Sequence, residues 1–227
     1  MSATLVIECS TPQATVALVE GDVVMQREFT SDRNHNAMLF EPMQELLGGR
    51  KDIERVLVGS GPGSYSGTRV GIAAAQGVGL ALGCPVIAVP SILAVPAADD
   101  GELYAAIGDA RRGTYWYCAV LKHQELKLQQ LDAKELMQMI GHCADKEFPA
   151  ITFEPPSQLP FQDFPKSELL KPYVRQEFPD AARLWKAWQA NSDEQKRKWA
   201  AEVAQPIYIK PPHITPGKRE SLINPGS

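Results

Sequence analysis

A glycine-rich loop between a predicted strand and a predicted helix constrains the fold of this chain more than any other segment. The loop, GSGPGSYSG at residues 59–67, follows a strand expected at Arg55–Val58 and precedes a helix expected from Thr68 to Leu82. Backbone amides at such a junction have no partner within the helix, and the helix dipole favours negative charge beside them. Glycine also lets another group approach the backbone closely. The loop is therefore either an anion-binding cradle or a tightly packed connection.

Residue spacing alone supports both interpretations of the loop equally. The candidate anion-binding residues are Gly61, Gly63, Ser64, Tyr65 and Gly67. No Gly-Lys-Ser/Thr follows them, as a P-loop requires, and the glycines lack the spacing of a dinucleotide-binding fingerprint. Small residues cover the following helix, which suits close packing of backbone on backbone inside the fold or against a partner. These small residues are Gly71, Ala73, Ala74, Ala75, Gly77, Gly79 and Ala81.

The elements predicted around the loop describe an α/β protein. Three short apolar strands come first, at Thr4–Ile7, Thr15–Val19 and Val23–Phe29. A helix is expected over Asn34–Leu47, and a buried strand at Pro85–Val89 follows the glycine loop and its helix. The sheet thus begins antiparallel and continues as strand, helix, strand, which defines a mixed α/β layer. Ser91 is expected to cap a short helix after this sheet.

A second half is predicted to begin at residue 102, so that the domains are residues 1–101 and 102–227. Two strands are expected at Leu103–Ile107 and Tyr115–Leu121, on either side of the sequence DARRGT. Asp132 and Glu135 form a capping box for a helix that runs to Ile140.

The rest of the second half is predicted to contain a long proline-rich loop followed by two helices. Six prolines between residues 154 and 180 predict a loop with at most one short strand. Helices are expected at Ala181–Gln189 and after Ser192, which pairs with Gln195 as a cap. A final strand is predicted at Pro206–Lys210, and the tail from Pro211 is expected to be mobile.

Composition excludes several classes of protein. The formal charge is −4, which argues against a chain that binds nucleic acid alone through a broad basic face. The four cysteines form no CxxC pair and indicate thiols of a reducing cytosol. The uncharged run from Val70 to Ala98 is interrupted by Pro85, Pro90 and Pro96, so no membrane span is expected. The start MSATLVIECS lacks the features of a signal peptide, and we expect a cytoplasmic location.

Several segments together resemble one known family. The run GSGPGSYSGTRVGIAAAQGVGLALGCPVIAV resembles the signature of the TsaB (YeaZ) family of tRNA threonylcarbamoyladenosine biosynthesis proteins. LVIECSTPQATVALVEGD, RNHNAMLFEPMQELL, AAIGDARRGTYWYCAV and AQPIYIK are similar to other segments of that family, in the same order. The resemblance is specific over Leu5–Leu121, about half of the chain, and Glu8 stands where the family usually has aspartate.

The resemblance implies a fold of the actin-like (ribonuclease H-like) type, with two related lobes, each a mixed sheet flanked by helices. It implies a non-catalytic scaffold that binds and supports TsaD, the subunit that makes N6-threonylcarbamoyladenosine at position 37 of tRNA. A TsaE-type ATPase would join the larger complex, the chain alone would form a homodimer, and tRNA would be met only through the complex. No cofactor and no membrane contact are implied.

Two residues support the non-catalytic interpretation. TsaD-type relatives hold a metal with two histidines just after the strand that matches Pro85–Val89, and here those positions are Ser91 and Val95. Valine has no donor atom and a neutral serine hydroxyl is a poor ligand, so we expect no metal site. No catalytic residue is assigned. An independent nucleotide-dependent phosphotransferase or ATPase that uses the glycine loop and Glu8 remains the alternative, although a structural hydrogen-bonding role for Glu8 is favoured.

Two helices are the expected partner surface. In the family the helices that match Asn36–Leu47 and Thr68–Leu82 meet the equivalent pair of TsaD, and the same pair can meet itself in a two-fold dimer. The partner-binding residues assigned on this basis are Met38, Leu39, Met43, Leu46, Leu47, Ile72, Ala75 and Gly79. One face of each helix must cover the sheet, and a second apolar face is predicted to stay open. The hairpin with Asp109, Arg111 and Arg112 is expected to face the cleft between lobes, with an Arg–Asp pair favoured over a phosphate contact.

Overall fold

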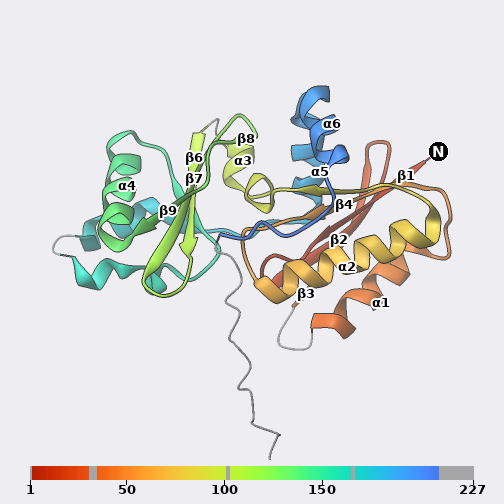
Figure 1. The fold of residues 1–227 in the computed structure, drawn as a ribbon, viewed down its shortest axis with the longest axis horizontal. Coiled ribbons are helices and arrows are strands. Elements are labelled where there is room, and N and C mark those ends of the chain that lie inside the picture. The colour runs from red at the N-terminus through yellow and green to blue at the C-terminus, as the bar shows by residue number, and fades with distance from the viewer. Residues whose placement is uncertain (1, 31–34, 101–102, 165–166, 210–227) are drawn as a thin grey trace, which may run out of the picture.

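The computed structural model describes residues 2–30, 35–100, 103–164 and 167–209, and within them two mixed β-sheets stand side by side (Figure 1). The first sheet contains β1 (Ala3–Glu8), β2 (Gln13–Glu20), β3 (Val23–Thr30), β4 (Ile53–Gly59) and β5 (Val86–Val89), in the spatial order β3-β2-β1-β4-β5. β2 pairs antiparallel with both β1 and β3, whereas β4 pairs parallel with both β1 and β5. The sheet therefore begins as a meander and continues through helical crossovers, as the sequence predicts.

The second sheet repeats this order of connections. It contains β6 (Leu103–Asp109), β7 (Thr114–Leu121), β8 (Gln124–Glu125), β9 (Gln129–Asp132), β10 (Ala150–Thr152) and β11 (Val174–Gln176), in the order β11-β10-β6-β7-β8 with β9 also on β7. β6 is antiparallel to β7 and parallel to β10, and β10 is parallel to β11. β6 thus occupies the place of β1. The predicted fold class, two related α/β lobes of the actin-like type, is confirmed.

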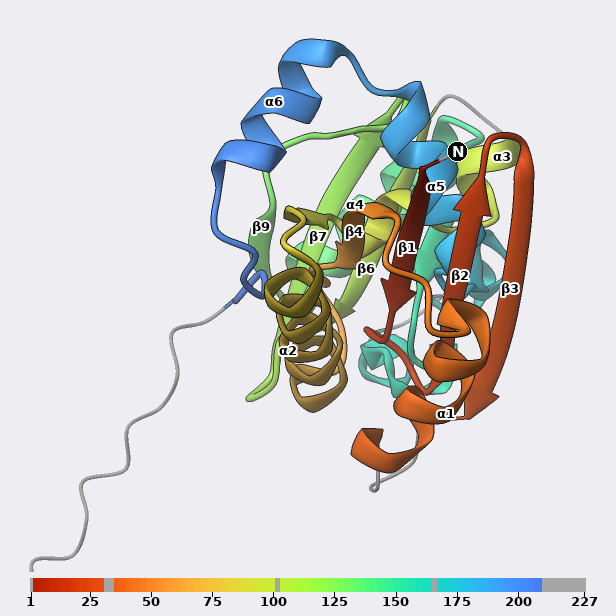
Figure 2. The same cartoon turned by 90° about the vertical axis from the view of Figure 1, so that its right-hand side faces the viewer.

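Two helices cover one face of the first sheet and lie side by side (Figure 2). They are α1 (His35–Leu47) and α2 (Tyr65–Leu82). α2 begins three residues before the predicted start because Ser64 caps it, accepting a hydrogen bond from the Gly67 amide at 3.2 Å. It ends at Gly83, whose φ of 68° lies in the left-handed region that glycine tolerates.

Two helices that follow the second sheet in the chain return to cover the opposite face of the first sheet. They are α5 (Ala181–Ala190) and α6 (Asp193–Ala201), seen above the strands in Figure 1. The start of α5 is fixed to β2, because the Ala181 amide donates to the Thr15 hydroxyl at 2.8 Å. The expected cap of α6 is present, with the Gln195 amide donating to the Ser192 hydroxyl at 3.2 Å. The predicted domain boundary falls at residues 101–102, which lie outside the described residues, and it stays a prediction.

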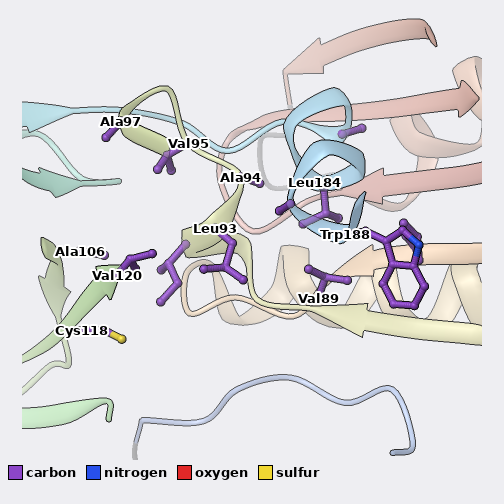
Figure 3. Packing of buried hydrophobic residues seen from close by; sticks show 14 of the residues in the cluster. Val89, Leu93, Ala94, Val95, Ala97, Ala106, Cys118, Val120, Leu184 and Trp188 are labelled. Carbon is purple, nitrogen blue, oxygen red and sulfur yellow. The ribbon is translucent and has the colours of Figure 1, made fainter. Parts of the chain in front are cut away.

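The two sheets share a core at the connection between the lobes (Figure 3). The connection consists of η1 (Ser91–Leu93) and α3 (Ala97–Asp100). Leu93, Ala94 and Val95 are buried there, between residues of α5 and of the second sheet. Residues of the first sheet, of this connection, of α5 and of the second sheet belong to one buried cluster, so the lobes share one continuous hydrophobic interior.

The second half follows the sequence predictions in part. The capping box of α4 (Ala133–Asp145) is present, although this helix continues past Ile140. The proline-rich stretch forms three short 3-10 helices, η2 (Pro156–Gln158), η3 (Pro160–Asp163) and η4 (Ser167–Tyr173), followed by β11. The strand predicted at Pro206–Lys210 is wrong over residues 206–209, which lie outside both sheets. Lys210 and the tail from Pro211 lie outside the described residues.

The described residues also bear on the cysteines and on membrane insertion. All four cysteines are free, and three of them, Cys9, Cys118 and Cys143, are buried. No helix in the described ranges has the length and apolar character needed to cross a bilayer.

Candidate functional site: the interlobe cleft and the outer helix face

A cleft of about 610 Å³ lies between the lobes, where the end of β1 meets the glycine loop. The second lobe contributes the turn after β6 and the two residues that follow β10, and the segment after α6 closes one side. Residues that line it include Ser10, Tyr65, Asp109, Arg111, Glu154 and Tyr208. The prediction that the hairpin of Asp109 and Arg111 faces the cleft is confirmed.

Close approach between β1 and the glycine loop explains three of the loop glycines. A Cβ at Gly59 would lie 1.9 Å from the Glu8 carboxyl oxygen Oε2. A Cβ at Gly63 would lie 2.3 Å from the Ser10 carbonyl oxygen, and one at Gly67 would lie 2.2 Å from that of Cys9. No side chain fits at such distances, so the loop packs on the Glu8 side chain at Gly59 and backbone on backbone at Gly63 and Gly67.

Several amides of the loop donate to protein acceptors. The Gly61 amide donates to the Ser91 hydroxyl at 3.0 Å, and the Ser64 amide donates to the Ser10 carbonyl at 2.6 Å. The Gly67 amide is taken by the Ser64 cap. Because these amides donate hydrogen bonds to groups of the protein itself, the contacts favour the interpretation of the loop as a tightly packed connection. Anion binding by Gly61, Gly63, Ser64, Tyr65 and Gly67 stays a prediction.

The two positions that the family resemblance matches to metal-binding histidines face the interior. Ser91 and Val95 are both fully buried, and the Ser91 hydroxyl accepts the Gly61 amide. The expectation that Ser91 caps a helix is wrong, because no side-chain cap bond is present at η1. Among the residues that the structure describes, no three His, Cys, Asp or Glu side chains gather as a metal site would require.

Glu8 lies fully buried beneath the glycine loop. Its Oε1 accepts a hydrogen bond from the Ser10 amide at 2.7 Å, while Oε2 has no hydrogen-bond partner among the described residues. Desolvation by burial raises the pKa of the Glu8 carboxyl, and the hydrogen bonds from Ser10 lower it by a smaller amount. The contacts agree with the structural role expected of Glu8.

The raised pKa of Glu8 predicts a measurable pH dependence of stability. A carboxyl whose folded-state pKa exceeds its unfolded value takes up a proton on folding. Its contribution is full below the unfolded pKa and is lost as the pH rises through the folded pKa. We expect Glu8→Gln, which keeps an acceptor for the Ser10 amide, to become more stable relative to the wild type as the pH rises from about 4 to about 8.

Urea unfolding across that pH range measures this difference. The control variant is Glu194→Gln, since Glu194 is an exposed carboxylate on α6. A constant difference in the free energy of unfolding between Glu8→Gln and the wild type would contradict the prediction.

The hairpin between β6 and β7 is held by its own charge pair. The Arg111 amide donates to one Asp109 carboxylate oxygen at 2.6 Å, and the Arg111 guanidinium donates to the other at 3.1 Å. Arg111 and Arg112 both have positive φ, at 68° and 58°. The favoured interpretation, an Arg–Asp pair that stiffens the turn, agrees with these contacts.

Most of the predicted partner-binding residues point into the core of the first lobe. Leu39, Met43, Leu46, Ile72, Ala75 and Gly79 are buried against the sheet, and Leu47 is half-buried. A Cβ at Gly79 would lie 2.4 Å from Val86 Cγ2, so this glycine permits close packing of α2 on β5. Met38 remains 44% exposed. The partner-binding role of these residues stays a prediction. Because most of their side chains are buried, a partner of the folded chain would contact the exposed residues beside them.

A different set of residues forms the outward surface of the two helices. On α2 the exposed positions include Ala73, Gly77 and Leu80, at helical spacing, and Leu80 is 88% exposed. A Cβ at Gly77 would meet nothing within 4 Å. On α1 Met38 and Phe40 are exposed. We use the name outer α1–α2 face for these five exposed residues of the two helices taken together. Ala73, Gly77 and Leu80 share one side of α2 at i, i+4, i+7 spacing, and none of them is among the partner-binding residues assigned from the sequence.

The fold and the cleft define a two-lobed protein of the actin-like class in which the glycine loop is packed against the first strand. The family model described as "TsaD: tRNA N6-adenosine threonylcarbamoyltransferase" matches residues 28–187. The chain belongs to this family, and within it to the TsaB (YeaZ) proteins.

Curated relatives and a solved structure agree with this assignment. An uncharacterized protein of Mycobacterium tuberculosis is 32% identical over 127 residues, 52% of this chain and 60% of that protein. TsaB of Bacillus subtilis is 30% identical over 56% of this chain and 58% of its own length. TsaB of Escherichia coli is 27% identical over 91% of this chain and 94% of its own. The match thus spans only about 60% of the first of these relatives.

The structural comparison supports the fold alone. YeaZ from Pseudomonas aeruginosa superposes with a TM-score of 0.66 at 21% identity, covering 92% of this chain and 100% of that one.

Proposed function

We propose that the chain is a non-catalytic subunit in the synthesis of N6-threonylcarbamoyladenosine in tRNA, and that it binds and supports a TsaD-type subunit. The relatives from B. subtilis and E. coli carry the name tRNA threonylcarbamoyladenosine biosynthesis protein TsaB, which supports a role in that pathway. The observation that carries the scaffold proposal is the outer α1–α2 face. A TsaE-type ATPase in a larger complex, a homodimer of the free chain and a cytoplasmic location belong to the same proposal.

The outer α1–α2 face has the chemistry of a helix-docking surface. Gly77 has open space where its Cβ would be, so the fold of the subunit does not require glycine there. Glycine within a helix lowers stability by about 0.5–1 kcal/mol relative to alanine, so the presence of Gly77 calls for another explanation. A partner helix that approaches the α2 backbone closely supplies that reason. Leu80 beside it offers an apolar side chain that gains by leaving water.

The cleft supports the non-catalytic part of the proposal. Ser91 and Val95 are buried away from solvent, and amides of the glycine loop already bind protein acceptors. Glu8 lies beneath the loop and is enclosed on all sides. These contacts weigh against the phosphotransferase alternative. Isothermal titration of the purified chain with ATP and magnesium tests that alternative directly, and tight magnesium-dependent binding would favour it.

Co-elution with the cognate TsaD-type subunit tests the scaffold proposal. We expect the two proteins to co-elute in size-exclusion chromatography with light scattering, and the chain to restore tRNA modification in a strain that lacks its own TsaB. Restoration of the modification in a strain that lacks TsaD would refute the scaffold proposal, because the chain would then perform the chemistry itself. Separate elution of the two subunits would refute the binding step.

A further inference from the structure

Two tyrosines lie exposed and close together at the mouth of the interlobe cleft. Tyr65 at the start of α2 is 55% exposed, and Tyr208 after α6 is 43% exposed. Their ring centroids are 5.8 Å apart and the rings are tilted by 43°. The segment of Tyr208 is fixed to the glycine loop, because the Ile207 amide donates to the Ser60 carbonyl at 2.8 Å. Residues far apart in the chain therefore build one aromatic surface over the cleft.

Cationic side chains flank the aromatic pair. The Arg69 guanidinium lies over the Tyr65 ring, 5.1 Å from its centroid, and donates to its hydroxyl. Arg111, whose side chain is 82% exposed, lines the cleft from the second lobe while paired with Asp109. Exposed aromatic rings beside arginines, in a protein with a net charge of −4, form a local combination typical of sites for single-stranded nucleic acid.

The acidic residues of the cleft fit a nucleobase better than they fit a bare phosphate. Asp109 is already paired with Arg111. Glu154 lines the same cleft and accepts a hydrogen bond from the Thr152 hydroxyl at 3.1 Å, and desolvation by burial raises the pKa of Glu154. A carboxyl group can accept a hydrogen bond from the exocyclic amino group of a base, whereas it repels a phosphate.

We infer that the aromatic rim of the cleft, defined as Tyr65, Tyr208, Arg69 and Arg111, binds an unpaired nucleotide of the RNA substrate. The base stacks on the exposed tyrosine rings, and the arginines meet the flanking phosphates. The inference rests on the proposed function, since that function brings an RNA to the complex. Unpaired bases are the parts of an RNA that can stack on aromatic side chains, because a duplex encloses the faces of its bases.

Fluorescence anisotropy on the complex with the TsaD-type subunit tests this inference. The probe is a fluorescein-labelled RNA hairpin with an unpaired loop, compared with the same sequence fully paired. We expect the wild type to prefer the hairpin, and the double variant Tyr65→Ala, Tyr208→Ala to bind it about 10-fold more weakly or worse. The double variant Tyr65→Phe, Tyr208→Phe keeps both rings and is expected to bind normally.

A matched control and two competing outcomes complete the experiment. Tyr173→Ala removes a tyrosine of similar exposure, 45%, from the second lobe and is expected to leave binding unchanged. Equal affinity of the double alanine variant and the wild type for the hairpin would overturn the inference. Equal affinity of the wild type for the hairpin and the duplex would also overturn it. The same holds if AMP displaces the labelled hairpin at the concentrations at which unlabelled hairpin displaces it.

The co-elution assay on the same variants separates this inference from the proposed function. We expect the double alanine variant to co-elute with the TsaD-type subunit as the wild type does, because both tyrosines lie outside the outer α1–α2 face. Co-elution without preferential hairpin binding would overturn the RNA inference alone. Failure of the wild type to co-elute would count against the proposed function itself.

Discussion

Replacing Leu80 by glutamate is expected to weaken association with the TsaD-type subunit by about 30-fold or more, equivalent to about 2 kcal/mol. Leu80 is 88% exposed, so the change removes little from the folded monomer. In a docked helix pair the same side chain would be buried, and a carboxylate there would lose its hydration without gaining a partner. The dissociation constant, measured by surface plasmon resonance or titration calorimetry, reports the effect.

The control for Leu80→Glu is the same substitution elsewhere. Leu169 in η4 is 72% exposed and lies in the second lobe, so Leu169→Glu matches the change in charge and apolarity. We expect Leu169→Glu to bind the TsaD-type subunit as the wild type does. If both variants bind equally well, α2 is not the docking surface, and if both lose binding equally, the effect is not specific to α2.

Two glycine-to-alanine substitutions in α2 are expected to change stability in opposite directions. Gly67→Ala would place a Cβ 2.2 Å from the Cys9 carbonyl oxygen, which is main chain and cannot rotate away. Such overpacking is expected to lower the free energy of unfolding by about 3 kcal/mol. Gly77→Ala places its Cβ in open space, and is expected to raise the free energy of unfolding by about 0.5–1 kcal/mol.

Urea unfolding of the isolated chain measures both glycine variants under one condition. Each variant is the matched control for the other, because both replace glycine by alanine in α2. A Gly67→Ala protein as stable as the wild type would mean that β1 and the loop can separate without cost. A destabilised Gly77→Ala protein would mean that the monomer already packs against this glycine.

The sequence predicts most of the elements of the first lobe, and several helices of the second half, because their signals are local. Strands such as Val23–Thr30 follow from apolar runs and turns, and the caps at Asp132 and Ser192 follow from side chains that bind amides three residues later. β10 is missed because three residues give no periodicity. The strand predicted at Pro206–Lys210 is wrong because the residues that are described form an extended segment, with Ile207 bound once to Ser60 instead of pairing in a ladder.

The orientation of α2 is the main part of the site that the sequence does not predict. Glycine and alanine occupy both of its faces, so hydrophobic periodicity cannot say which face covers the sheet. Only tertiary contacts distinguish Gly79, which lies against Val86, from Gly77, which meets open space. The aromatic rim is likewise invisible in the sequence, because Tyr65 and Tyr208 are separated by most of the chain and meet only after α5 and α6 return to the first sheet.

The return of α5 and α6 to the first sheet makes the two halves of the chain inseparable. The inner surface of β1, β2 and β4 is sealed by helices encoded almost a hundred residues after the last strand of that sheet. Trp188 and Trp199 lie in the same buried cluster as Val6 and Leu57, so a chain cut off before α5 is expected to leave this face of the first sheet open to water.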